Sequence, residues 1–151
     1  MSSEVVIRKV RGAEDFPVLV DIWRSAVAAT HDFLEEKHRA DIEERLATTY
    51  LPHVNLVVAE RDGEPVGFAG TDSGKLEMLF VDAESRGSGI GTALLEHVIA
   101  THDVVSVDVN EQNDQAVGFY AHAGFVVVGR SPVDGDGLPY PLLHMTLPCE
   151  S

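Results

Sequence analysis

The spacing of hydrophobic and polar residues along the chain predicts a mixture of strands and helices. Consecutive or alternating apolar residues are typical of strands, whereas apolar residues that recur every three or four positions are typical of helices. Strands are predicted at about residues 5–10, 56–59, 65–70, 75–81, 104–109, 125–128 and 142–147. Helices are predicted at about residues 15–29, 35–49, 89–101 and 113–123. The order of these elements indicates an α/β (α+β) fold.

Two features of this order predict how the strands pair. Asp62-Gly63 separates the second and third predicted strands, and an Asp-Gly pair is a strong signal for a hairpin. Residues 75–81, 89–101 and 104–109 form a strand–helix–strand unit, whose two strands are expected to be parallel. The remaining strands are expected to be antiparallel.

The composition predicts one globular domain that spans residues 1–151. Hydrophobic residues make up 44% of the chain, which is enough for a sizeable core. No apolar run reaches the roughly 18 residues of a membrane span, and no secretory signal precedes the first strand. The single cysteine, Cys149, excludes an internal disulfide. A cytoplasmic protein is expected.

The formal net charge of −14 narrows the classes of partner. Such an acidic surface repels nucleic acid and anionic membranes, so neither is expected as a partner. The same negative electrostatic potential favours the binding of a cationic amine. An anionic ligand would have to be held by local donors against the overall charge.

A glycine-rich loop follows the predicted strand 75–81 and precedes the predicted helix 89–101. Its residues are Arg86, Gly87, Ser88, Gly89, Ile90 and Gly91. The first N–H groups of a helix have no partner in the helix and lie at the positive end of its dipole. Glycines leave these groups open to an anion, and Arg86 adds a positive charge. The pattern predicts a diphosphate-binding site.

Three kinds of diphosphate loop can be compared with this pattern. A P-loop requires a Lys after its last glycine, and Thr92 stands there instead. A dinucleotide-binding loop requires a third glycine at Thr92, although Asp108 stands where such a loop needs an acid. The coenzyme A loop of the GNAT acyltransferases, Gln/Arg-x-x-Gly-x-Gly/Ala, is matched by Arg86, Gly89 and Gly91. A glycine-rich turn without a ligand also remains consistent with these residues alone.

A second motif follows at the distance that the GNAT family would require. It consists of Asn113, Ala116, Phe119, Tyr120, Gly124 and Phe125. Their spacing resembles the GNAT pattern Asn-x-x-Ala-x-x-Phe-Tyr-x-x-x-Gly-Phe. Within that family, the YjaB-type bacterial N-acetyltransferases look most similar, through residues 30–34, 109–113, 129–131 and 139–143. The resemblance therefore covers nearly the whole chain.

The resemblance implies a fold and an activity. The implied fold is a mixed, mostly antiparallel sheet of about seven strands with a central splayed parallel pair, flanked by about four helices. The implied activity is transfer of an acetyl group from acetyl-CoA to a primary amine, either a small molecule or a protein lysine. No metal is implied, and a homodimer is compatible with the family.

The resemblance also assigns residues to the binding of coenzyme A. The pyrophosphate would lie on the loop and the start of its helix, that is Arg86, Gly87, Ser88, Gly89, Ile90, Gly91 and Thr92. The pantetheine arm would lie between the splayed strands, against backbone groups of Leu79, Phe80 and Val81. Asn113 would bind this arm, and Tyr120 would lie beside the thioester sulfur.

Tyr120 is the candidate acid that protonates the departing thiolate. Asn113 and Tyr120 are seven residues apart, which places them on one face of a helix with the small residue Ala116 between them. A purely structural interpretation is also open, in which Tyr120 packs in the core and Asn113 caps the helix.

Glu77 is the candidate base that deprotonates the amine. In an alternating strand it shares a face with Leu79 and Val81, whereas Leu76, Met78 and Phe80 share the other. An acid in such an apolar strand is either a solvated-face residue or a site residue.

His31 is the alternative base, in a segment that could equally be a helix cap. His144 and Tyr140 are weaker candidates for the wall of the acceptor site. No His-x-x-x-His pair with a nearby acid is present, so no metal site is predicted.

Two other classes of protein remain as alternatives. A non-catalytic module that binds acyl-CoA would keep the loop and Tyr120 but accept no amine. A nucleotide-dependent oxidoreductase would use the loop for a dinucleotide. A comparison of coenzyme A binding with NAD binding separates it from both the acetyltransferase and the acyl-CoA-binding module.

Overall fold

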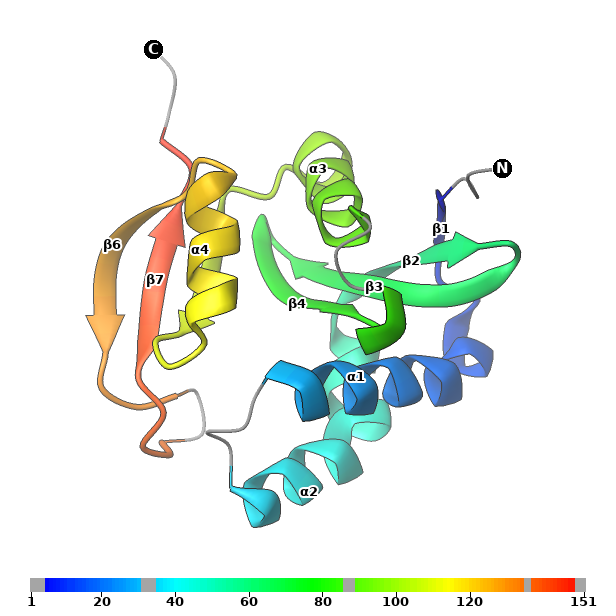
Figure 1. Cartoon of the computed structure of the whole chain (residues 1–151), viewed down its shortest axis with the longest axis horizontal. Helices are drawn as coiled ribbons and strands as arrows, with labels where there is room; N and C mark the ends of the chain where they lie inside the picture. Colours follow the sequence, from blue (N-terminus) through cyan, green and yellow to red (C-terminus); the bar gives the residue numbers. More distant parts are fainter. Residues whose placement is uncertain (1–4, 31–34, 86–88, 135–136, 149–151) are drawn as a thin grey trace.

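The computed structural model describes residues 5–30, 35–85, 89–134 and 137–148. In these residues seven strands form one sheet with the order β1-β2-β3-β4-β5-β7-β6 (Figure 1). The strands are β1 (Val5–Lys9), β2 (Asn55–Arg61), β3 (Glu64–Asp72), β4 (Lys75–Val81), β5 (Ser106–Asn110), β6 (Val126–Ser131) and β7 (Leu142–Thr146). The α-helices are α1 (Phe16–Thr30), α2 (Glu36–Arg45), α3 (Ile90–His102) and α4 (Asp114–His122).

Only β4 and β5 are parallel among the paired strands of this sheet. They pair only through Lys75 with Ser106 and Leu76 with Val107, although both strands continue beyond these residues. Beyond Leu76 the two strands diverge, which leaves the β5-facing edge of β4 without a strand partner. The predicted mixed sheet with a central splayed parallel pair is therefore confirmed.

Two hydrophobic cores lie on opposite faces of the sheet. The first core lies under α3 and α4, and the second lies under α1 and the turns that follow α2. The alternation along β2 supplies both cores: Val57 and Ala59 belong to the first, and Leu56 and Val58 to the second. In Figure 1, α1 and α2 accordingly lie beside the β1–β4 half of the sheet.

A β-bulge at Glu77 changes the predicted faces of β4. Gly70 of β3 pairs with Met78 and Thr71 pairs with Leu76, so Glu77 is an extra residue between two ladder positions. Because the bulge shifts the alternation by one residue, Leu76 lies in the first core, whereas Met78 packs against the second. The prediction that Leu76 shares a face with Met78 and Phe80 was wrong for this reason.

Local sequence signals explain the ends of several elements. Asp62 and Gly63 both have positive φ, at 55° and 80°, as the predicted hairpin turn requires. Asn113 caps α4, because its Oδ1 accepts a hydrogen bond from the N–H of Ala116 at 3.2 Å. Gly124, at φ 104°, follows that helix.

The second predicted helix, residues 35–49, differs in its last part. The regular α-helix ends at Arg45, and Leu46–Tyr50 forms a π-helical turn. The N–H of Leu51 then bonds to the carbonyl of Leu46, five residues earlier. Wider spacing of this kind places Leu46 and Leu51 on the same side, and both are buried in the second core. A helical pattern with a period of 3.6 residues could not indicate this turn.

Candidate active site

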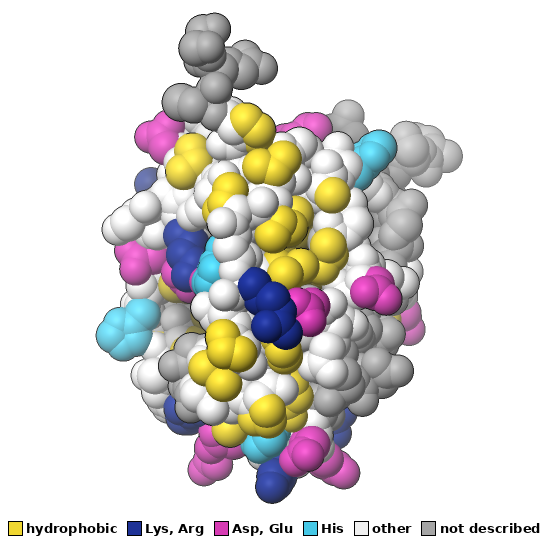
Figure 2. All heavy atoms as spheres, turned by 90° about the vertical axis from the view of Figure 1, so that its left-hand side faces the viewer, with side chains coloured by type: hydrophobic (Ala, Val, Ile, Leu, Met, Phe, Trp, Pro, Cys, Tyr) yellow, Lys and Arg dark blue, Asp and Glu magenta, His cyan; other side chains and the backbone are white. Residues whose placement is uncertain are grey.

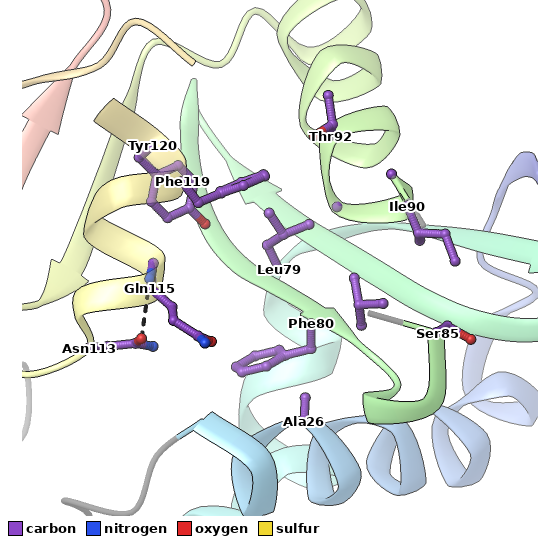
Figure 3. A pocket seen from close by; sticks show the side chains of 14 residues that line it. Ala26, Leu79, Phe80, Ser85, Ile90, Thr92, Asn113, Gln115, Phe119 and Tyr120 are labelled. Carbon is purple, nitrogen blue, oxygen red and sulfur yellow. Dashed lines mark hydrogen bonds between the residues drawn. The ribbon is translucent and has the colours of Figure 1, made fainter. Parts of the chain in front are cut away.

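A cavity of about 420 Å³ lies beside β4, between the start of α3 and α4 (Figure 3). Its walls come from β4, from the start of α3 and from α4, with Ala26 of α1 and Ser85 at the margin. The residues from the three main walls are Leu79, Phe80, Val81, Gly89, Ile90, Gly91, Thr92, Asn113, Gln115, Ala116, Phe119 and Tyr120. The fold thus brings together all the predicted coenzyme-binding residues that it describes. Arg86, Gly87, Ser88 and His31 lie outside the described residues.

The N-terminus of α3 opens onto this cavity. The first bond of the helix joins the N–H of Ala93 to the carbonyl of Gly89 at 3.0 Å. The N–H groups of Ile90, Gly91 and Thr92 precede that bond and have no partner in the helix. Gly89 has a φ of 83°, and a Cβ built on it would meet no atom within 4 Å. This wall therefore offers free donors and the positive end of a helix dipole to an anion.

Tyr120 forms the opposite wall of the cavity. Its ring packs edge-on against Phe119 and Phe125, with centroid distances of 5.1 and 5.7 Å. The side chain is only 7% exposed, and its hydroxyl points into the space between α4 and β4 (Figure 3). No hydrogen bond joins this hydroxyl to another group in the described part of the chain. Burial raises the pKa of Tyr120 above its ordinary value, so the hydroxyl keeps its proton at neutral pH.

Glu77 lies in a smaller cavity of about 120 Å³ between the diverging strands. Asp108 and Asn110 of β5 line this cavity on the other side, and Tyr120 reaches it from α4. The bulge turns Glu77 out of the β4 alternation, and its side chain is 36% exposed. The fold therefore places the candidate base and the candidate acid on one cavity.

Comparisons with known proteins agree with this geometry. The family model described as an acetyltransferase (GNAT) domain matches residues 20–147. The chain belongs to the GNAT family of acetyltransferases. It is 48% identical to the peptidyl-lysine N-acetyltransferase YjaB of Salmonella typhimurium over 136 residues, which cover 89% of this chain and 93% of that protein. The Escherichia coli protein of the same name is 46% identical over 143 residues, which cover 93% and 95%.

Solved structures share the GNAT fold. The solution structure of apo-form YjaB from Escherichia coli superimposes with a TM-score of 0.86 at 43% identity, covering 95% of this chain and 97% of that chain. A crystal structure of the PaiA N-acetyltransferase from Thermoplasma acidophilum in complex with coenzyme A gives a TM-score of 0.74 at 20% identity, covering 95% and 99%. The chain is thus an N-acetyltransferase by family and by fold.

This GNAT chain also carries a polar network that the sequence did not reveal. The Nζ of Lys75 lies 2.7 Å from Oδ2 of Asp108, and Nδ1 of His144 lies 2.6 Å from the other oxygen, Oδ1. Nε2 of His144 lies 2.7 Å from the hydroxyl of Ser131. The network crosses four neighbouring strands, from β4 through β5 and β7 to β6. In the sequence, this network is visible only as polar residues at alternate positions of the strands. The pairing of the strands decides which of these residues meet.

The network changes the ionisation of two of its members. Burial acts to raise the pKa of Asp108, but the bonds from Lys75 and His144 outweigh it and leave that pKa below its ordinary value. The bond to Asp108 raises the pKa of Lys75, against the opposing effect of burial. At neutral pH the pair is a carboxylate and an ammonium ion.

The two weaker acceptor candidates take different places in this GNAT fold. His144 belongs to the network, on β7. Tyr140 is buried, and its hydroxyl accepts a hydrogen bond from the N–H of Glu35 at 3.1 Å and contacts His38. Tyr140 thus fastens the start of α2, and it lines neither of the two cavities described above.

Two further findings concern the described ranges as a whole. No three His, Cys, Asp or Glu side chains there are grouped as metal ligands would be. None of the helices in these ranges has the length and apolar character needed to cross a bilayer.

Proposed function

We propose that this GNAT protein transfers the acetyl group of acetyl-CoA to the side-chain amine of a protein lysine, by direct attack on the thioester. The observation that carries the proposal is the continuous cavity between the N-terminus of α3 and the hydroxyl of Tyr120. The acceptor class rests on two relatives that are 46% and 48% identical and are named peptidyl-lysine N-acetyltransferases.

Three parts of the described structure suit coenzyme A. The free N–H groups at the start of α3 suit the pyrophosphate, and in the sequence they directly follow Arg86, Gly87 and Ser88, which lie outside the described residues. The unpaired edge of β4 at Leu79, Phe80 and Val81 suits the amide groups of the pantetheine arm, because both carry peptide-like donors and acceptors. Asn113 lines the cavity at the first turn of α4 and suits the same arm.

Tyr120 is the group that we assign to the departing sulfur. Attack by the amine breaks the bond between the carbonyl carbon and sulfur, so negative charge develops on sulfur in the transition state. A hydroxyl that keeps its proton and points into the cavity stabilises that charge by donating a hydrogen bond. The phenylalanines on either side fix the ring, so the hydroxyl needs little reorganisation during the reaction.

Glu77 is the group that we assign to the proton of the amine. Only a neutral amine attacks a carbonyl carbon, so the acceptor must lose a proton before or during attack. Glu77 lies on the cavity that Tyr120 reaches, and its exposed side chain can pass a proton to solvent. His31 remains the alternative base.

The test is release of the free thiol from acetyl-CoA in the presence of lysine peptides and small amines. We expect thiol release with a lysine peptide and none with the same peptide after its lysine has been acetylated. Binding of coenzyme A without thiol release for any amine would instead indicate a non-catalytic acyl-CoA-binding module.

A further inference from the structure

On the face of the sheet opposite the first core, α1 covers β2, β3 and β4, whereas the β5–β7–β6 half contributes no described residue to the second core. Val107 and Val109 of β5 are buried in the first core, so Asp108 between them lies on the opposite face. The second core, on that same side, contains residues of β2, β3 and β4 but none of β5, β6 or β7 among the described residues. An acceptor can therefore approach the smaller cavity from this side.

Two carboxylates at this opening already hold an ammonium group. Nζ of Lys75 lies 2.7 Å from Oδ2 of Asp108 and 3.9 Å from Oε1 of Glu77. Both acids line the smaller cavity, which Tyr120 also lines. Lys75 does not itself line the cavity, but its ammonium contacts both carboxylates that do.

The hydroxyl of Tyr120 is a second observation that points to a ligand at this cavity. Tyr120 is more than nine-tenths buried, and its hydroxyl has no hydrogen-bond partner in the described part of the chain. The oxygen itself is open to the cavity and is not sealed in the core. A donor that faces the cavity from a buried ring, with no protein partner, is placed to bind a group there.

We propose that Glu77 and Asp108 form the subsite for the ammonium group of the acceptor lysine, and that Lys75 occupies this subsite until the acceptor displaces it. The inference rests on the proposed function, because it assumes a cationic amine as the acceptor. It adds an acceptor-binding role for Asp108 and an occluding role for Lys75.

The exchange of one ammonium for another has a low free-energy cost. The carboxylates are never left unpaired, which is the expensive state for a partly buried charge. The Lys75 side chain is 38% exposed, and an ion pair of that exposure contributes little to stability. His144 holds the second oxygen of Asp108 and is itself held by Ser131, so the carboxylate keeps its orientation when Lys75 leaves.

The arrangement also predicts which side chains can bind as acceptors. Two carboxylates accept a cationic side chain and repel an acidic one, whereas a neutral group fails to displace Lys75. Glu77 then receives the proton from the bound ammonium, and the neutral nitrogen attacks. Asp108 positions the acceptor and takes no part in the covalent step.

The first measurement is steady-state kinetics with Nα-acetyl-lysine N-methylamide as the probe. Lys75→Met removes the competing charge at nearly constant length, so we expect the KM for the probe to fall about three- to tenfold. Lys75→Arg keeps a cation against the acids and should keep the KM near the wild-type value. Asp108→Asn should raise that KM about tenfold or more. Lys37→Met replaces an exposed lysine of α2 and is the distant control, which should leave the KM for the probe unchanged.

The second measurement follows displacement directly and needs no turnover. The chain has three lysines, Lys9, Lys37 and Lys75. Reductive ¹³C-methylation of these lysines keeps their charge and gives one resolvable NMR signal for each. With coenzyme A present, the probe should move the Lys75 signal and leave those of Lys9 and Lys37 in place. Nα-acetyl-norleucine N-methylamide, which lacks the ammonium group, should move none of them.

The two measurements separate this inference from the transferase proposal. Turnover with an unmoved Lys75 signal, or an unchanged KM in Lys75→Met, would overturn the ammonium subsite and leave the transferase proposal intact. A Lys75 signal that moves without any turnover would support the subsite and contradict the transferase proposal.

Discussion

At the scale of single residues, Tyr120 combines a packing role with a hydroxyl that faces the cavity. Its ring is fixed between Phe119 and Phe125, and its hydroxyl faces the cavity. The structural interpretation of Tyr120 and its assignment to the site are therefore compatible, because they concern different atoms of one side chain. Asn113 likewise has two roles, because its Oδ1 caps α4 and the residue also lines the cavity.

Replacement of Tyr120 by phenylalanine separates these two roles. Tyr120→Phe keeps the ring and removes only the hydroxyl, so we expect kcat to fall about ten- to a thousand-fold. Acetyl-CoA affinity should change by less than about tenfold, and the melting temperature only slightly. The matched control is Tyr140→Phe, which removes a buried hydroxyl that lines neither cavity. That variant should lose about 1 kcal/mol of stability and keep its kcat. A wild-type kcat for Tyr120→Phe, measured where chemistry limits the rate, would make Tyr120 a packing residue.

The base is tested by the pH profile of turnover. We expect Glu77→Gln to lower turnover at neutral pH and to remove the acid limb of the profile, because an amide cannot accept the proton of the amine. Affinity for acetyl-CoA should hardly change. Glu64→Gln, an exposed acid on β3, should behave as wild type. If the acid limb survives in Glu77→Gln and His31→Ala abolishes it, the role belongs to His31.

At the scale of elements, the ends and irregularities of β4 and α3 make the site. The bulge at Glu77 moves that carboxylate to the splay, and the divergence from β5 frees the backbone edge of β4. Gly89, in the left-handed region, turns the chain into α3 so that the first N–H groups face the cavity. Each of these irregularities places a group where the ligand is expected.

Substitution of Gly89 tests the diphosphate site on α3. Gly89→Val introduces a side chain into the cavity wall, so we expect coenzyme A affinity, measured by calorimetry, to fall at least about tenfold, or ~1.4 kcal/mol. The variant should also lose some stability, because valine is strained at a φ of 83°. Gly12→Val is the matched control. Gly12 has a φ of 75°, a Cβ there meets nothing within 4 Å, and it lies outside the cavity wall.

For these two variants, similar losses of melting temperature are expected, with weaker coenzyme A binding only in Gly89→Val. Arg86→Ala should also weaken binding through loss of a positive charge. Unchanged affinity in a folded Gly89→Val protein would rule out this site.

At the scale of the whole molecule, charge and shape decide how partners approach. The net charge of −14 opposes the binding of a tetra-anionic coenzyme, so local donors must hold it, whereas the same charge favours a cationic acceptor. The side of the molecule that carries the β6 edge shows a broken band of hydrophobic side chains with charges of both signs beside it (Figure 2). Val126, Val127 and Val128 of β6 are exposed. The homodimer that the family resemblance allows would have apolar surface available here, and sedimentation velocity tests it.

A buried ion pair predicts how the fold responds to pH through Asp15. Arg8 of β1 binds Asp15, the residue before α1, and Glu60 of β2, with contacts of 2.9 and 2.8 Å. The bond from Arg8 holds the pKa of Asp15 below its ordinary value, against the opposing effect of burial. A depressed pKa in the folded state stabilises the fold above the unfolded pKa of about 4, and this stability is lost as pH falls through the folded value.

We therefore expect Asp15→Asn to destabilise the protein at pH 7 by roughly 3 kcal/mol, the cost of removing one partner of a buried ion pair. The difference from wild type should shrink at pH 3, where the wild-type carboxylate also begins to lose its charge. Urea unfolding at pH 7 and at pH 3 measures the difference in unfolding free energy between wild type and Asp15→Asn at each pH. Asp41→Asn breaks only an exposed pair with Arg45 and should cost less than about 1 kcal/mol. A difference for Asp15→Asn that stays constant with pH would exclude the ion pair as its cause.

The sequence by itself determined the elements whose signals are local. Hydrophobic spacing predicted each strand and each α-helix, because burial on one face imposes a period on neighbouring residues. The Asp62-Gly63 turn and the Asn113 cap also followed from local backbone requirements. The family, the splayed pair and the set of residues on the cavity followed from two motifs of fixed spacing, since such spacing reflects one arrangement of helix ends and strands.

Only the tertiary structure decided features that depend on neighbours distant in the chain. The bulge at Glu77 arises from the register of β4 against β3, so it could not be read from β4 alone, and it moved Leu76 to the other core. The network from Lys75 to Ser131 joins residues of four strands whose order in the sheet differs from their order in the chain. The proposed site therefore divides by physical cause: local backbone chemistry specified the proposed coenzyme side, whereas strand register and order specified the proposed acceptor side.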